Sequence, residues 1–390
     1  MAKGELGARI REIAAAVAVG AAAFLISLAF WPFGTEAGWL IERYEALSVD
    51  PFGSSQYSHR ILAPLLAHWL HLDGHRFRIL TLLFSPLFLA AIYAYCRRAA
   101  VPAAGSMAIV LAFALSRAVG NSSLAPGLTD TLTYFLLILT LLAVARPYAF
   151  WVLVALNLLN HEQSAFLLPW LLYVRHAAGA LRLRPDAVLG ALVLGLYAIW
   201  RASIDTGVVA LHVAYTIRPA ADYVAEYGMV WWFLLTSLGF LLVCLCWYAA
   251  RGRFERNSVL LCLACAAAPY VMAWDPPRYI HLASGVFLIS AVEFLTDRRR
   301  LAWFAGLLAG NALLYFASQR VMERAVASFV SSCRGSADPE RCIHLSTLYV
   351  TVPSLLALPL MWWIARRVPP PAGEKARPAQ SRGRHDGLVS

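Results

Sequence analysis

Long apolar stretches alternate with short polar ones along almost the whole chain, and no polar stretch is long enough to form a separate soluble domain. A helix needs about 20 apolar residues to cross the hydrocarbon core of a bilayer. Runs near this length recur up to residue 365 and predict an all-α, polytopic transmembrane bundle of about 11 to 12 spans. The twelve expected spans are 13–32, 76–96, 103–119, 129–145, 147–160, 162–175, 186–203, 229–250, 257–273, 279–296, 301–318 and 347–365.

The fifth and sixth of these stretches, 147–160 and 162–175, are short and meet at a polar junction that begins at Asn160. They could be two crossings, a re-entrant pair or one long kinked helix. The basic residues favour a pair, because Arg146 and Arg175 then fall on the same side of the membrane.

The composition agrees with a membrane protein, since 60% of the residues are hydrophobic and 14% are charged, against about 25% charged in soluble domains. The net charge of +11 is topological. With the amino terminus inside, 21 of the 33 basic residues and 8 of the 22 acidic residues are cytoplasmic, as the retention of Lys and Arg on that side requires. We therefore expect an integral plasma (inner) membrane protein with both termini cytoplasmic, and no nucleic acid partner.

One membrane domain is expected over residues 1–367, followed by a basic cytoplasmic tail, 368–390, whose Pro, Gly and Arg content is typical of disorder. The first extracytoplasmic loop, 33–75, has apolar residues at helical spacing near both of its ends, which predicts two amphipathic helices at the interface. Cys333 and Cys342 flank a polar loop expected on the outer, oxidising side, and they are a candidate disulfide.

Eight of the ten histidines and most acidic residues fall on the outer side in this topology. Near the membrane boundary an ionisable side chain is costly and suggests function. In the first loop, Asp50 can act as a general base, while His59 and Arg60 can hold a phosphate. The alternative is an Asp-Pro turn followed by an Arg that reaches the lipid headgroups.

Two further polar segments lie deeper in the chain. Arg117 precedes Asp130, which opens a span and can cap its helix or belong to the site. His161 and Glu162 lie at the junction near Asn160, where position 165 is Ala, so the HExxH zinc motif is incomplete. Such a junction is tolerated within a membrane where it is buried in protein or lines a cavity, which favours a role in a site.

The fourth segment contains Arg278, directly after a double proline turn, and His281 three residues further on. Arg278 suits bidentate phosphate recognition. The alternative is a local ion pair with Asp275, which stabilises little at a surface.

An acid in the first outer loop, amphipathic helices in that loop and basic groups at the outer boundary resemble the GT-C superfamily of integral membrane glycosyltransferases. This resemblance covers roughly residues 1–300 and implies a polyprenyl-phosphate-linked sugar as donor, with membrane lipids around it. It also implies that Asp50 is the base and that Arg60 or Arg278 holds the lipid phosphate. Many members have paired acids in this loop, whereas Asp50 stands alone here.

No cofactor is firmly expected, although a divalent cation stays open, with ligands from Asp130, Glu162 or waters. The rival function is a transporter or lipid-carrier flippase, which predicts matching broken helices in two symmetric halves. Only one break, near residue 160, is evident. A polymerase or ligase of lipid-linked polysaccharide would share the same outer site.

Overall fold

A computed structural model of the chain describes residues 3–31, 39–53, 58, 60–204, 239, 241–268, 281–317, 359 and 361–368, and all regular structure within them is helical. The helices are α1 (Lys3–Phe30), α2 (Trp39–Val49), α3 (Leu62–Trp69), η1 (Gly74–Arg76), α4 (Phe77–Arg98), α5 (Ala103–Ala114), α6 (Arg117–Leu124), α7 (Asp130–Leu142), α8 (Pro147–Asn160), η2 (Glu162–Leu167), α9 (Leu168–Ala177), α10 (Leu183–Ser203), α13 (Leu241–Arg251), α14 (Arg253–Ala267), η4 (His281–Ala283), α16 (Ser284–Leu295), η5 (Arg298–Arg300) and α17 (Leu301–Ala317).

Three of the described helices are long and apolar enough to cross a membrane, over Leu6–Phe30, Gly74–Arg98 and Leu183–Ser203. A fourth span results if α5 and α6, which are bent by 48° at their junction, are counted together. Other apolar helices have 10–17 residues. The all-α fold and the presence of helices able to span a membrane are thus confirmed, while the number of 11 to 12 crossings stays a prediction.

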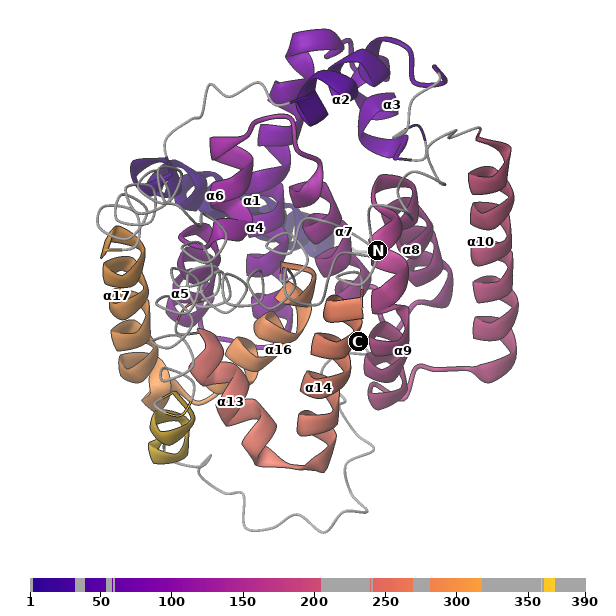
Figure 1. Cartoon of the computed structure of the whole chain (residues 1–390). Coiled ribbons are helices and arrows are strands. Elements are labelled where there is room, and N and C mark those ends of the chain that lie inside the picture. The colour runs from indigo at the N-terminus through magenta and orange to yellow at the C-terminus, as the bar shows by residue number, and fades with distance from the viewer. Residues whose placement is uncertain are drawn as a thin grey trace, which may run out of the picture.

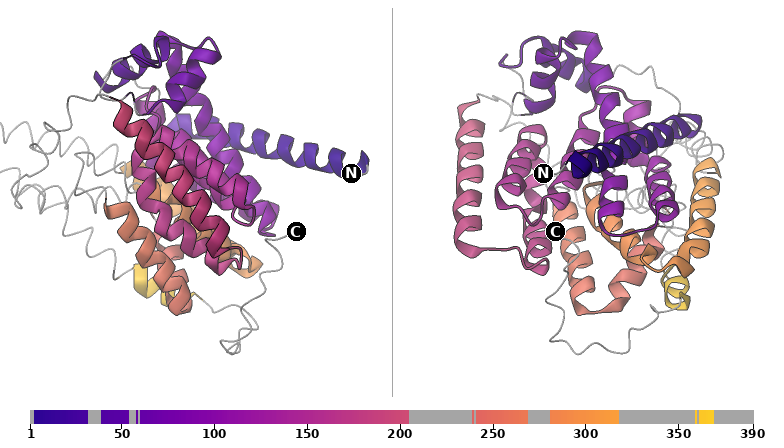
Figure 2. Two further views of the ribbon diagram at one scale, coloured as in Figure 1. Left: turned by 90° about the vertical axis from the view of Figure 1, so that its right-hand side faces the viewer. Right: turned by 180° about the vertical axis from the view of Figure 1, so that it is seen from behind.

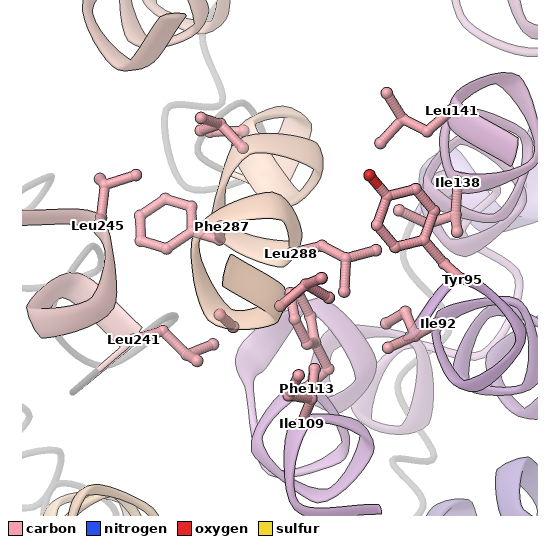
Figure 3. Close-up of a cluster of buried hydrophobic side chains, with 14 of the residues drawn as sticks. Ile92, Tyr95, Ile109, Phe113, Ile138, Leu141, Leu241, Leu245, Phe287 and Leu288 are labelled. Atoms are coloured by element: carbon pink, nitrogen blue, oxygen red, sulfur yellow. The ribbon is translucent and has the colours of Figure 1, made fainter. Parts of the chain in front are cut away.

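The main core lies where α4, α5 and α7 meet α13 and α16 (Figures 1 and 3). Ile92, Phe113 and Ile138 come from the first three helices, and Leu241 and Phe287 from the other two. In a bilayer, helices associate through close packing rather than through exclusion of water. The two halves of the sequence therefore form one packed body within the described residues.

Helix α1 packs closely on α4 through a glycine. A Cβ atom at Gly20 would lie 2.4 Å from the carbonyl oxygen of Pro86, so only glycine permits this approach. Beyond the contact, the amino-terminal half of α1 projects away from the bundle (Figure 2) and exposes Leu6, Ile10 and Ile13.

Helices α2 and α3, the pair expected from the first loop, form a layer over one end of the bundle (Figure 1). This α2–α3 layer has its own small core, in which Tyr44 and Leu47 pack near Phe77 of α4. Glu45 of α2 binds Arg78 at 2.5 Å and lies 2.9 Å from a ring nitrogen of His75. The layer is therefore fixed to the start of α4.

The segment 147–177 reverses direction, as expected for a pair of helices. The backbone leaves α8 at His161, whose φ of −155° is extended, and returns through η2 and α9. At the end of α9 the Arg175 guanidinium donates to the carbonyl of Val144, just before α8 begins. The helices α8 and α9 are thus antiparallel, and a single kinked helix is excluded.

The α9–α10 and α13–α14 connections lie at the end of the bundle opposite the α2–α3 layer (Figure 1). Several helices have basic residues in their last turn, among them α4, α9 and α13. Arg98 donates to the carbonyl of Leu142 at 2.9 Å, and Arg251 pairs with Glu293 at 2.6 Å. Arg300 is buried, with its guanidinium 4.3 Å from the centroid of the Trp247 ring. We refer to this end as the basic end.

Candidate functional site

Several polar residues lie where short helices stop, toward the α2–α3 layer. Asp130 begins α7 and Asn160 ends α8. At about 1.5 Å per residue, α7 and α8, with 13 and 14 residues, are each roughly 20 Å long, against about 30 Å for a bilayer core. A polar junction at these helix ends would therefore lie deeper in the membrane than the ends of the longer helices.

Asp130 and His161 come together at this junction, as the sequence predicts. Asp130 is the first residue of α7 and is 8% exposed, and its Oδ1 lies 3.8 Å from Nε2 of the buried His161. Thr129 occupies the N-cap position, but its side chain makes no capping hydrogen bond. A carboxylate in the first turn of a helix interacts favourably with the helix dipole, so an acidic residue suits the position of Asp130 at the start of α7.

Asn160 joins the end of α8 to the start of α7. Its Nδ2 donates to the carbonyl of Thr129 at 3.0 Å and to Oγ1 of Thr133 at 2.8 Å. Asn157, one turn earlier, donates to the carbonyl of Thr133 at 3.3 Å. These contacts were not predicted. The signal for them is the spacing of the two asparagines, which lie three residues apart on one face of an apolar helix.

His281 is fully buried beside the same junction. Its ring lies edge-on to Tyr134 with 5.8 Å between centroids, and it lies within electrostatic range of Asp130 and Arg117. Within the described residues neither ring nitrogen has a hydrogen-bond partner. Because a buried polar atom without a partner costs free energy, both nitrogens are suited to a ligand. Asp130, Asn160, His161 and His281, with Arg117 nearby, are called the polar cluster below.

Arg60 and Glu162 form a second pair that joins the α2–α3 layer to the start of η2. Nε and Nη2 of Arg60 donate to the two carboxylate oxygens of Glu162 at 2.8 and 2.6 Å, and Nη1 donates to the Tyr44 hydroxyl at 3.0 Å. Burial disfavours the charged guanidinium, but Glu162 and Tyr44 outweigh it and raise the pKa of Arg60 above its ordinary value. Arg60 is thus occupied by protein groups rather than left open for phosphate.

Glu162→Gln is expected to lower the free energy of unfolding by about 1–2 kcal/mol, because one charge-assisted bond is weakened while Glu162 is partly screened by solvent. Its side chain is 30% exposed. Unfolding of the purified protein in mixed micelles with increasing denaturing detergent, followed by circular dichroism, measures the change. Glu42→Gln, at an exposed position on α2, is the control, and equal stability of the two variants would contradict the role of the pair.

In the part of the chain that the structure describes, the Asp50 carboxylate forms no hydrogen bond or ion pair with these groups. Asp50 is exposed at the end of α2, where its carbonyl accepts a hydrogen bond from the Gly53 amide at 3.0 Å. Its place in a shared site therefore stays a prediction. His59, Arg278, Cys333 and Cys342 lie outside the described residues.

The remaining expectation concerns a divalent cation. In the part of the chain that the structure describes, no group of three or more His, Cys, Asp or Glu side chains is arranged to hold a metal ion. The polar cluster offers one carboxylate, two imidazoles and one guanidinium, a set suited to proton transfer and to binding an anion. No protein-family model, curated protein or solved structure matches this chain.

Proposed function

We propose that this protein is an integral membrane glycosyltransferase of the GT-C type. It would move a sugar from a polyprenyl-phosphate carrier to an acceptor on the extracytoplasmic side. The observation that carries the proposal is the polar cluster, buried at the end of short helices near the α2–α3 layer. A buried carboxylate beside imidazoles at a helix junction is costly to maintain without a function.

The geometry favours Asp130 as the base over the other two candidate acids. Both oxygens of Glu162 accept hydrogen bonds from Arg60, so this carboxylate is poorly placed to take a proton. Asp50 is exposed on the α2–α3 layer. Asp130 is buried beside His161 and His281, where a reacting hydroxyl would be shielded from water.

In this mechanism the Asp130 carboxylate takes the proton of the acceptor hydroxyl. The hydroxyl oxygen then forms a bond to the anomeric carbon of the sugar. The bond from that carbon to the carrier phosphate breaks, and the phosphate leaves with the electron pair. Arg117 and His281 would stabilise the charge that develops on the phosphate.

The proposal includes the full topology of 11 to 12 spans with both termini in the cytoplasm. The gathering of Arg98, Arg251 and Arg300 at the basic end supports the placement of that end inside. The α2–α3 layer and the polar cluster would then face outward. A transporter needs polar groups accessible from both faces, whereas the polar cluster lies toward one end.

The test is turnover of radiolabelled polyprenyl-phosphate sugars by the purified full-length protein reconstituted in vesicles. Because the acceptor is unidentified, release of polyprenyl phosphate is measured first, with water as a slow acceptor. When candidate sugar acceptors are then added outside the vesicles, we expect turnover to rise in vesicles that expose the α2–α3 layer outward and to rise much less in the opposite orientation. The proposal is wrong if no donor is consumed while the same vesicles accumulate a solute.

A further inference from the structure

A stripe of hydrogen-bond donors runs along one half-buried face of α10 near its end at Ser203. Tyr197, Trp200 and Arg201 are spaced by three and four residues, which places them on one face of the helix. All three are half-buried. The Tyr197 hydroxyl and the Trp200 indole nitrogen are buried atoms without a hydrogen-bond partner in the described structure.

The chemistry of the stripe selects the kind of ligand. An indole N–H only donates, a guanidinium only donates, and a phenol can donate. None of the described residues forms an ion pair with Arg201. One positive charge beside two unused donors calls for a compact anion rich in acceptor oxygens, and phosphate fits this description.

The charged side chains around the stripe have a net positive charge. Tyr197 lies within electrostatic range of Glu162, Arg201 and Arg60. Glu162 is matched by its ion pair with Arg60, so the positive charge of Arg201 is left over in this group. An anion at the stripe would meet Arg201 without displacing the Arg60–Glu162 pair.

The outer face of α10 indicates where the anion comes from. This helix stands at the side of the bundle, with its Ser203 end on the same side as the α2–α3 layer (Figure 1). Its outer residues Leu192, Leu196 and Ile199 are exposed, and the helix is long and apolar enough to cross a bilayer. In a membrane this face meets acyl or prenyl chains.

We propose that Tyr197, Trp200 and Arg201 bind the phosphate headgroup of a membrane lipid whose chains lie along the outer face of α10. The occupant reaches the stripe from within the bilayer rather than from water. This goes beyond the proposed function, since the lipid binds whether or not a sugar is transferred.

The experiment measures binding to the purified full chain in a phosphate-free detergent by native mass spectrometry. The probes are decaprenyl phosphate, decaprenol, phosphatidylglycerol and inorganic phosphate. Decaprenyl phosphate is expected to bind at least about tenfold more tightly than decaprenol or inorganic phosphate. If phosphatidylglycerol binds as tightly as decaprenyl phosphate, the site exists and bulk phospholipid is its occupant. If phosphatidylglycerol binds more weakly, the site exists and the polyprenyl phosphate is its occupant.

Arg201→Gln is expected to weaken decaprenyl phosphate binding about tenfold and Tyr197→Phe about threefold, while Arg201→Lys keeps most of the affinity. Arg184→Gln is the matched control, because Arg184 is an exposed arginine in the first turn of the same helix. Wild-type affinity of Arg201→Gln, or equal binding of decaprenol, would overturn the inference. Loss of binding in Arg201→Gln without any sugar turnover by the wild type would uphold it and reject the proposed function alone.

Discussion

Asp130→Asn is expected to lower the turnover of polyprenyl-phosphate sugar by about 10³-fold, because a positioned general base contributes roughly 10² to 10⁴ to the rate. Asparagine has nearly the same shape as aspartate, so the start of α7 and the contact between Asn160 and Thr129 should persist. Turnover is measured in reconstituted vesicles at saturating donor, so that the change is seen in kcat.

Two further Asp→Asn variants test whether the loss of turnover is specific to Asp130. Asp73→Asn removes an exposed acid before η1 whose side chain makes no capping hydrogen bond, and its turnover should match the wild type. Asp50→Asn addresses the acid that the family resemblance favours. If this variant is inactive while Asp130→Asn turns over normally, Asp130 is not the base and the site lies at the α2–α3 layer.

Asp186→Ala is expected to cost about 3–5 kcal/mol of stability, because it leaves a buried guanidinium without its counterion. Arg175 is fully buried, and its Nε lies 3.0 and 3.1 Å from the two oxygens of Asp186. The same carboxylate accepts from Trp151 Nε1 at 2.9 Å and from the Arg182 amide at 2.7 Å. Unfolding in mixed micelles by added denaturing detergent measures the loss.

The double variant Arg175→Met with Asp186→Leu is the control for this prediction. A buried ion pair replaced by apolar residues of similar size often costs little, so the double variant should regain most of the stability. If it is as unstable as Asp186→Ala, the loss comes from the backbone at the start of α10 rather than from the uncompensated charge.

The positions of several helices could be predicted, because the apolar run in the sequence begins and ends close to where the helix begins and ends. The expected span 147–160 coincides with α8, and 76–96 differs from α4 by one or two residues at each end. The expected span 103–119 hides a bend at Ser116, whose hydroxyl bonds to the carbonyl of Phe113. A serine in an apolar run does not reveal that bend, because its side chain can also point elsewhere within a straight helix.

The sequence indicates which polar residues are candidates for the site, but it does not indicate which of them pair. Polarity at the outer boundary identified Arg60, Asp130, His161 and Glu162 as candidates, yet Arg60 and Glu162 are 102 residues apart. Their pairing depends on how the α2–α3 layer packs, which no local pattern encodes. Arg175 was counted as a mark of topology, whereas its burial makes it part of the packed structure.

The different lengths of the helices bear on how the protein fits a bilayer. Helix α10, with few buried residues, has 21 residues and is roughly 31 Å long, while α7 has 13 residues, most of them buried. Hydrophobic mismatch arises only where a helix touches lipid. The length of α10 matches the thickness of the bilayer, and α7 is shielded from lipid by protein. The short helices can therefore hold the polar cluster inside the bundle without thinning the membrane around them.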